Sequence, residues 1–282
     1  MDTFINIIKA ILFGIVEGIT EWLPISSTGH IILLDEFVKL DCSAAFFDVF
    51  EVVIQLGAIM AVIIMFFGKL NPFAPSKSVE EKKSTWSLLV KILIATIPAA
   101  AVGVVLDDLM DQYLYNAWVV ALALISYGVA YIFIERKHAA ANIEYRINQV
   151  EEITYKDALK IGCFQMLSLV PGTSRSGSTI LGAMMIKTRR EVAAEFSFFM
   201  AIPVMLGASF LKLLKFFMDG NTMSMEEIGI ILVASVVAFV VSLFAIKFLM
   251  AFVKKHSFEF FGKYRIVLGL VVLGYFAIKL VF

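Results

Sequence analysis

The sequence predicts an all-α polytopic membrane protein with six transmembrane helices and two re-entrant helical hairpins, arranged as inverted-topology repeats. The first observation is composition: hydrophobic residues make up 60% of the 282 residues, charged residues only 17%, and the mean hydropathy is +0.89. The second is the apolar stretches of about 20 residues, the length of a helix that crosses a bilayer. The third is a pair of apolar stretches interrupted by similar turns rich in Gly and Ser.

The same composition excludes two other classes of protein. A soluble globular domain is about half apolar and about one quarter charged. Lys plus Arg and Asp plus Glu are equal at 24 each, so no basic excess is available to bind nucleic acid. We therefore expect membrane lipids around the chain and no nucleic acid partner.

The first half of the chain, repeat 1 over residues 1–135, opens with a broken segment. Residues 4–23 are apolar, run into the turn at 24–30, and the apolar pattern resumes to residue 34. Non-helical backbone at membrane depth is tolerated only where protein or a wet cavity surrounds it, so this segment is predicted to be a re-entrant hairpin. Three full spans follow, at 46–67, 86–106 and 117–135.

The second half, repeat 2 over residues 155–282, has the same plan after a cytoplasmic linker at 136–154. Its broken segment runs over 158–170, the turn at 171–177 and an apolar stretch to 186, and its spans lie at 192–217, 227–253 and 264–281. Residues 1–282 are thus predicted to form a single membrane domain.

The two broken segments resemble each other at a shift of 148 residues. This shift aligns Gly14 with Gly162, Glu17 with Gln165, Ser26 with Ser174, Thr28 with Ser176, and Gly29 with Gly177. Chance similarity between two apolar stretches is the alternative explanation. Because each half holds three crossings, an odd number, the second half would start on the opposite side, which makes the repeats inverted and brings both turns toward the midplane.

Basic residues predict the orientation. Lys and Arg gather in loops on one side of the predicted spans, which is therefore assigned to the cytoplasm; this set includes Lys69, Lys77, Arg146 and Arg265. Both termini and the mouth of the first hairpin then face the extracytoplasmic side.

Two carboxylates on the first hairpin are candidates for chemistry. Glu17 and Glu21 are four residues apart, so both project from one helix face. Each ionised group at membrane depth costs about 2.5–3.5 kcal/mol on insertion scales. Mg²⁺ or Ca²⁺, a shared proton or a cationic partner would relieve this cost. The structural alternative is that one carboxyl is simply protonated, or that the pair lies near the outer interface.

A hydroxyl run with a histidine follows. Ser26, Ser27 and Thr28 stand where a helix restarts, and hydroxyl residues cap helix N-termini. Ser27 and His30 are spaced to share one helix face, so the imidazole is a candidate general base or acid for the hydroxyl or for a bound phosphate. A structural role of the histidine is the alternative.

The second turn has the composition of an anion site. Arg175 is always protonated and its planar donors match phosphate oxygens, while glycine lets the backbone approach a ligand closely. The candidate binding residues are Ser26 and Thr28 on the first turn with Gly172, Thr173, Ser174, Ser176 and Thr179 on the second. A permanent ion pair of Arg175 with Glu17 or Glu21 is the alternative, and both can hold at once, with the pairing present in the empty state.

Together these motifs resemble a known family over essentially the whole chain. They are Glu17-Gly18-Ile19-Thr20-Glu21, Pro24-Ile25-Ser26-Ser27-Thr28-Gly29-His30, Pro171-Gly172-Thr173-Ser174-Arg175-Ser176-Gly177, Phe50-Glu51-Val52 and Ala194-Glu195-Phe196. The sequence closely resembles the bacterial undecaprenyl pyrophosphate phosphatases of the bacitracin-resistance type.

The resemblance implies an enzyme of the bacterial plasma membrane that hydrolyses a C55 polyprenyl diphosphate to the monophosphate carrier and inorganic phosphate. It allows a homodimer. Arg175 would hold the diphosphate, Glu17 and Glu21 a divalent cation, Mg²⁺ or Ca²⁺, and His30 would move protons. The attacking group is either Ser27 or a metal-bound water that Ser27 and His30 orient, and the sequence leaves both open.

A polyprenyl-phosphate flippase or transporter is the strongest competing interpretation, since broken helices that meet at mid-depth in inverted repeats are a transporter architecture. A carrier needs charge complementarity but no nucleophile beside a proton acceptor, so Ser27 and its neighbours favour a hydrolase. A phosphatase of the phosphatidic-acid type is disfavoured because no proline of this chain follows an arginine.

Overall fold

The computed structural model describes residues 2–141 and 143–281, and within these ranges it contains helices and no strand. An isolated bridge joins Ile147 to Thr188. The helices are α1 (Asp2–Thr20), α2 (Ser27–Phe37), α3 (Ala44–Met65), α4 (Phe67–Leu70), α5 (Val79–Leu114), α6 (Ala117–Ala140), α7 (Tyr155–Gln165), α8 (Arg175–Met185), α9 (Arg190–Met218), α10 (Met225–Phe252) and α11 (Glu259–Val281), with short 3-10 turns at Val150–Glu152 and Met166–Leu169.

Seven helices of the described chain are long and apolar enough to cross a membrane: α1, α3, α5, α6, α9, α10 and α11. The six predicted spans correspond to the last six of these, and the chain is a multi-pass membrane protein. The seventh is α1, whose stretch Thr3–Thr20 qualifies by length and composition. This stretch was predicted to be one arm of a broken segment because the turn that follows it interrupts the apolar pattern.

Two of the predicted spans, 86–106 and 117–135, are shorter than the helices that contain them. The span predicted at 86–106 is part of a longer helix, α5, which begins at Val79 because Ser78 and Glu81 form a capping box. The linker predicted at 136–154 is partly helical, since α6 continues to Ala140. His138, expected in a loop, is therefore on this helix, and it is buried.

One face of α10 shows how these helices meet lipid. Its exposed side chains recur every fourth residue, at Leu232, Val236, Val240, Phe244 and Phe248. Such a stripe lies along one side of a helix. A continuous apolar surface of this kind is what a bilayer covers.

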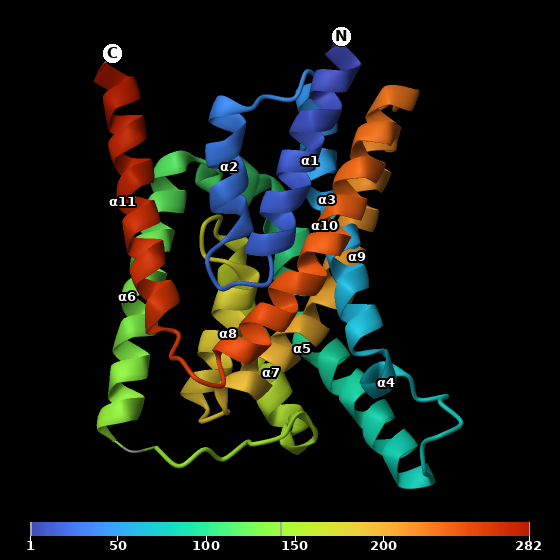
Figure 1. Cartoon of the computed structure of the whole chain (residues 1–282), viewed down its shortest axis with the longest axis vertical. Helices are drawn as coiled ribbons and strands as arrows, with labels where there is room; N and C mark the ends of the chain where they lie inside the picture. Colours follow the sequence, from blue (N-terminus) through green and yellow to red (C-terminus); the bar gives the residue numbers. More distant parts are fainter. Residues whose placement is uncertain (1, 142, 282) are drawn as a thin grey trace.

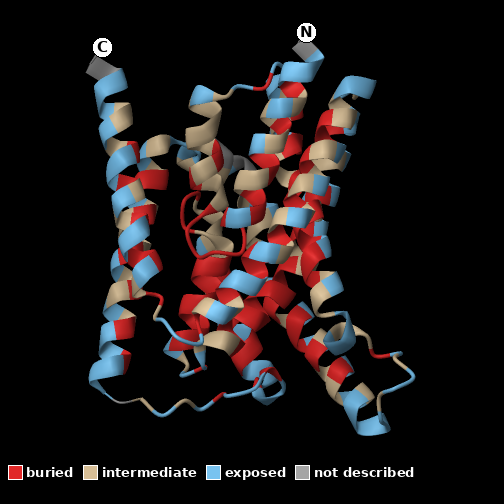
Figure 2. Ribbon diagram, viewed as in Figure 1, coloured by how far each residue is buried: buried red, intermediate tan, exposed pale blue. Residues whose placement is uncertain are grey.

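The two turns that interrupt the broken segments lie beside each other in the interior. In Figure 1 the N- and C-termini are at the same end of the molecule, and the turn after α1 lies next to the turn before α8, away from both ends. The Ser176 hydroxyl donates to the carbonyl oxygen of Glu21 at 3.1 Å, although the two residues are 155 positions apart. Figure 2 shows the turn after α1 as buried, and the expectation that the two stretches meet is confirmed.

The helices after the two turns begin in the same way. Ser26 precedes α2 with φ 75°, and Ser174 precedes α8 with φ 73°. Each side chain accepts from the third N–H of its helix, that of Gly29 at 3.3 Å and that of Gly177 at 3.0 Å. A non-glycine residue in this left-handed region is strained by about 1–3 kcal/mol, which the surrounding contacts must offset.

Glycines let several helices pack backbone to backbone. A Cβ on Gly57 of α3 would lie 2.0 Å from the carbonyl oxygen of Ser235 on α10, and one on Gly162 of α7 would lie 2.3 Å from that of Ala95 on α5. Small residues that allow such close approach are the usual means of helix association in membranes.

Gly57→Ala is therefore expected to lower the thermal stability of the purified protein in detergent. The added methyl group would force α3 and α10 apart, and such overpacking costs about 1–3 kcal/mol. Gly207→Ala on α9 is the matched control, because a Cβ there meets nothing within 4 Å. Equal melting temperatures for the two variants would contradict the prediction.

Candidate functional site

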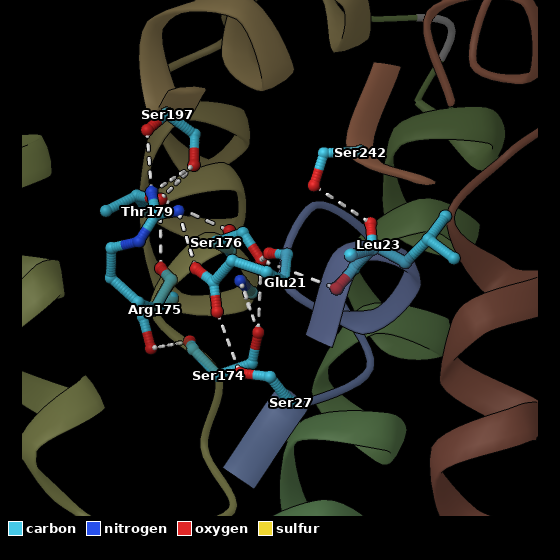
Figure 3. Close-up of polar contacts among 12 residues, drawn as sticks. Glu21, Leu23, Ser27, Ser174, Arg175, Ser176, Thr179, Ser197 and Ser242 are labelled. Carbon is cyan, nitrogen blue, oxygen red and sulfur yellow. Dashed lines mark hydrogen bonds and ion pairs between the residues drawn. The ribbon is translucent and has the colours of Figure 1, made fainter. Parts of the chain in front are cut away.

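The centre of the site is an ion pair between the two halves of the chain. Arg175 begins α8 and its Nη2 donates to Oε1 of Glu21 at 2.9 Å (Figure 3). The side chains are 10% and 6% exposed, so the pair is largely shielded from solvent. Nη1 donates to the carbonyl oxygen of Ser197 on α9 at 2.7 Å, and the guanidinium lies 5.9 Å from the Trp22 ring centroid. The pairing of Arg175 with Glu21, which was raised from the sequence, is present in this structure.

Ser27 lies against the same carboxylate. Its hydroxyl donates to Oε2 of Glu21 at 2.7 Å, so Glu21 accepts from Ser27 with one oxygen and from Arg175 with the other. Figure 3 shows Ser27 and Arg175 approaching Glu21 from different segments. A hydroxyl on a carboxylate that is held by a guanidinium is a potential nucleophile with a proton acceptor already in contact.

Glu17 is placed differently from Glu21. It is fully buried, and neither of its carboxylate oxygens has a hydrogen-bond partner. Its counterpart in the alignment of the two halves, Gln165, is also fully buried with both amide atoms unpartnered. Buried polar groups without partners are rare and point to a water, ion or ligand that completes them.

The metal prediction concerns these carboxylates and stays a prediction. The unpartnered oxygens of Glu17 suit a hard cation such as Mg²⁺ or Ca²⁺, which prefers oxygen ligands. Both oxygens of Glu21 already accept hydrogen bonds. Among the described residues no group of three or more His, Cys, Asp or Glu side chains is placed to hold a metal. A cation would therefore be held by Glu17 with a share from Glu21, and most of its ligands would come from water and phosphate.

His30 is engaged away from Ser27. Its Nδ1 lies 2.7 Å from the carbonyl oxygen of Ser26, and because a carbonyl only accepts, Nδ1 carries a proton. Its Nε2 lies 2.7 Å from the hydroxyl of Tyr264 on α11, and the two rings are stacked. The imidazole was expected to contact Ser27, but the partner of Ser27 is Glu21. A proton-moving role of His30 stays a prediction.

The hydroxyls of the second turn mostly bind protein groups. Ser176 is buried and donates to the carbonyl oxygen of Glu21, Thr179 is buried and lies 2.6 Å from the Ser197 hydroxyl, and Ser174 caps α8. The Ser176 contact joins the two halves of the chain, and the other two contacts lie within the second half. The predicted role of these hydroxyls in binding substrate stays a prediction.

Gly172 and Thr173 also serve the packing of the second turn. Gly172 has φ +88°, and a Cβ on it would lie 2.5 Å from the carbonyl oxygen of Val120 on α6, so only glycine fits. The close approach expected toward a ligand is made here to another helix. Thr173 is 1% exposed.

Thr28 points to an open part of the site. It lines a cavity of about 150 Å³ together with Ser168, Leu169 and Pro171 of the second broken segment, and with Gly103, Met110 and Tyr115. Polar and apolar groups from both halves thus border this space.

Sequence reasoning missed three contributors: Ser197, Tyr264 and Arg265. Arg265 was assigned to the basic cytoplasmic flank, but it is fully buried and donates to carbonyl oxygens of both turns. Arg265 was the second residue of the span predicted at 264–281 and was counted with the flank, whereas α11 begins at Glu259 and places it further inside the helix. An arginine inside an apolar span was the available signal.

The chain is similar to several known proteins over nearly its whole length. The family described as Bacitracin resistance protein BacA matches residues 10–271. An undecaprenyl-diphosphatase of Enterococcus faecalis is 57% identical over 272 residues, covering 96% of this chain and 98% of that protein. Proteins of the same name from Lactococcus lactis subsp. cremoris and Streptococcus thermophilus are 55% and 54% identical, covering 97% and 99% of this chain and 98% and 96% of theirs.

The family match spans the ion pair, the serine run and both turns, which all lie within residues 10–271. With identities above one half over nearly the full length of each relative, the chain belongs to the bacitracin resistance protein BacA family.

Proposed function

We propose that this protein hydrolyses undecaprenyl diphosphate to undecaprenyl phosphate and inorganic phosphate, as the names of its relatives state for them. The observation that carries the proposal is the Ser27 hydroxyl on Glu21, with Arg175 on the other oxygen of that carboxylate. A nucleophile, a proton acceptor and a phosphate-binding cation are thus in contact. A lipid carrier would need the cation but not the other two.

The chemistry follows from these contacts. When substrate enters, its diphosphate oxygens compete with Glu21 for the guanidinium of Arg175, which matches phosphate by two parallel hydrogen bonds. Ser27 Oγ forms a bond to the terminal phosphorus as the bond to the bridging oxygen breaks. The hydroxyl proton passes to Glu21 Oε2, and undecaprenyl phosphate leaves. Water then hydrolyses the phosphoserine and releases phosphate.

Positioning and charge neutralisation are the main contributions in phosphoryl transfer. Arg175 neutralises charge on the transferred group, and the N-terminus of α8 adds its partial positive charge. A bound divalent cation would supply further neutralisation at Glu17.

The test is phosphate release from a C55 diphosphate by the purified protein in detergent. We expect one undecaprenyl phosphate for each phosphate released, with multiple turnovers per protein. Absence of turnover, together with protein-dependent movement of polyprenyl phosphate across vesicles, would favour the carrier.

We propose that Glu17, with a share from Glu21, binds the divalent cation used by the reaction. Excess chelator should abolish phosphate release, and Mg²⁺ or Ca²⁺ should restore it. Glu17→Gln should raise the half-saturating metal concentration at least about 10-fold, because loss of even indirect support of a metal ligand weakens binding by this factor. Glu36→Gln, at an exposed ion pair with Lys279, is the control. Full activity in chelator would refute metal use.

We also propose the inverted-repeat arrangement, with both broken segments re-entrant. The support is that the first helix of each half packs against the other half: α1 of the first half packs on α10 of the second, and α7 of the second packs on α5 of the first. The two contacts correspond. In each of them a glycine packs closely against a backbone carbonyl, Gly14 against that of Ala234 and Gly162 against that of Ala95. The third helices of the two halves, α6 and α11, pack on each other.

The proposed orientation places the termini and the mouth of the site outside. In a background with both cysteines replaced, Thr222→Cys should react with an impermeant maleimide in intact cells, because its loop lies on the side of the termini. Ser76→Cys, in the basic loop, should react only after permeabilisation. The reverse pattern of labelling would invert the proposed orientation.

A further inference from the structure

Arg265 lies between the two turns of the site. It is fully buried on α11, and its Nη1 donates to the carbonyl oxygen of Pro24 at 3.1 Å. Its Nη2 donates to the carbonyl oxygens of Gly172 and Thr173, both at 2.9 Å. One guanidinium therefore binds three carbonyls from two segments that are about half a chain apart. The ring of Tyr127 on α6 supports it from the side, with its centroid 5.6 Å away.

These three contacts determine how the turns face the site. Three carbonyl dipoles whose oxygen ends converge on one point repel each other unless a cation lies among them. In a trans peptide the C=O and N–H point in opposite directions, so the N–H groups of Ile25, Thr173 and Ser174 are turned away from Arg265.

The residues that follow the two turns are the reacting ones. Ser26 and Ser174 cap α2 and α8, and the next residues along the chain are Ser27 and Arg175. Both side chains contact Glu21, at 2.7 Å and 2.9 Å. The separation between the nucleophile and the phosphate-binding cation therefore depends on the separation between the two turns.

We propose that Arg265 is a positioning residue that fixes the distance between Ser27 and Arg175 by holding both turns through their carbonyls. It acts through the backbone and does not touch the reacting atoms. The proposal rests on the proposed hydrolysis, because its effect on rate is defined for that reaction.

The arrangement requires arginine in particular. The planar guanidinium presents donors in a fixed fork, whereas the ammonium of lysine is a compact point charge on a flexible stem. Lysine at 265 would keep the positive charge but would not hold both turns in a fixed geometry. Misplacement of reacting groups by about 1 Å costs on the order of 100-fold in rate.

The test compares Arg265→Lys and Arg265→Met with the wild type, using purified protein that elutes as a single species. For Arg265→Lys we expect kcat per folded molecule to fall about 100-fold, with KM changed less than about threefold, because misplacement affects the transition state more than binding. Arg265→Met should lose at least as much. A residue that merely stabilises the fold would lower the melting temperature and leave kcat per folded molecule unchanged.

Arg136 provides the matched control. It also joins α6 to α11, through an ion pair with Glu259 at 3.0 Å, but it is largely exposed. Arg136→Lys and Arg136→Met should leave kcat and KM unchanged.

A second readout does not depend on activity. The chain has three tryptophans, and Trp22 is fully buried at the first turn, whereas Trp86 and Trp118 are exposed. With Trp86 and Trp118 replaced by Phe, fluorescence reports Trp22 alone. We expect a red-shifted emission in both Arg265 variants at temperatures where they are folded, and no shift in the Arg136 variants.

The outcomes separate the two proposals. If Arg265→Lys keeps at least half of the wild-type kcat, or Trp22 emission is unchanged, the positioning role is overturned. If the wild type releases no phosphate, the proposed hydrolysis fails, and the Trp22 emission still decides whether Arg265 holds the turns. If neither Arg265 variant folds, Tyr127→Leu removes the supporting ring alone; a red shift there supports the role, and unchanged emission and kcat overturn it.

Discussion

Arg175→Ala is expected to lower kcat for phosphate release by about 10³-fold or more, the range seen when an arginine that stabilises phosphoryl transfer is removed. Arg175 donates to Glu21 and to the carbonyl oxygen of Ser197, so its guanidinium is held between the turn after α1 and the helix α9. When substrate replaces Glu21 on this guanidinium, the charge developing on the transferred phosphoryl group is neutralised without rearrangement of the protein.

The same variant should also be less stable, for a separate reason. Glu21 is buried, and removal of its cation leaves an uncompensated charge, which costs about 3–5 kcal/mol. Adding Glu21→Gln should recover much of this stability without recovering activity. A double variant that regains activity would contradict the role assigned to Arg175.

Arg190→Ala is the matched control for the loss of a buried ion pair. Arg190 donates to the buried carboxylate of Glu135, and the 2.8 Å contact ties α9 to α6 away from the serine run. This variant should lose comparable stability but keep its kcat per folded molecule. If both arginine variants lose kcat alike, the effect of Arg175 would be a general consequence of breaking a buried pair.

The sequence was informative where polar residues interrupt an apolar pattern. Glu17 and Glu21 were identified because charge at membrane depth is costly and needs a partner, and Arg175 because its guanidinium matches phosphate oxygens. The meeting of Glu21 with Arg175 could be anticipated from the likeness of the two broken segments. The long helices were predicted from hydropathy, since a span depends on length and composition, which are local properties.

Contacts that depend on tertiary geometry were not predictable in the same way. Ser197 contributes a backbone carbonyl to Arg175, and any residue could supply that group. The partner of His30 is Tyr264, 234 positions along the chain, and the spacing of His30 from Ser27 could not reveal it. Arg265 was misassigned because it stands at the edge of the predicted span and was counted with the flank, whereas α11 begins at Glu259 and its side chain is buried.

Ser27→Ala should lower kcat at least as strongly as loss of Arg175, by about 10³-fold or more, if Ser27 forms the covalent intermediate, because splitting a transfer into two steps depends on the nucleophile. The Ser27 hydroxyl donates to Glu21 Oε2 at 2.7 Å, so its proton acceptor is already in contact. Glu21→Gln should also be strongly impaired, since an amide in that place does not accept the proton.

Ser26→Ala separates the nucleophile from the helix start. Ser26 caps α2 through the N–H of Gly29, and its loss should cost about 1 kcal/mol of stability with a modest change in kcat. The two adjacent hydroxyls thus differ in role. The Ser26 hydroxyl bonds to its own helix, whereas the Ser27 hydroxyl bonds to the carboxylate of Glu21 in the turn after α1.

The decisive measurement is rapid quenching of the wild type with substrate labelled at the terminal phosphate. Attack by Ser27 predicts acid-stable label on the protein, located to Ser27 by peptide mapping and lost in Ser27→Ala. Attack by water predicts unlabelled protein throughout turnover. In that case Ser27→Ala should lower kcat only by the contribution that Ser27 makes to orienting the water. An intermediate on the pathway must form and decay at least as fast as the overall reaction. Label that appears on Ser27 and disappears at least as fast as phosphate is released would therefore establish the two-step route.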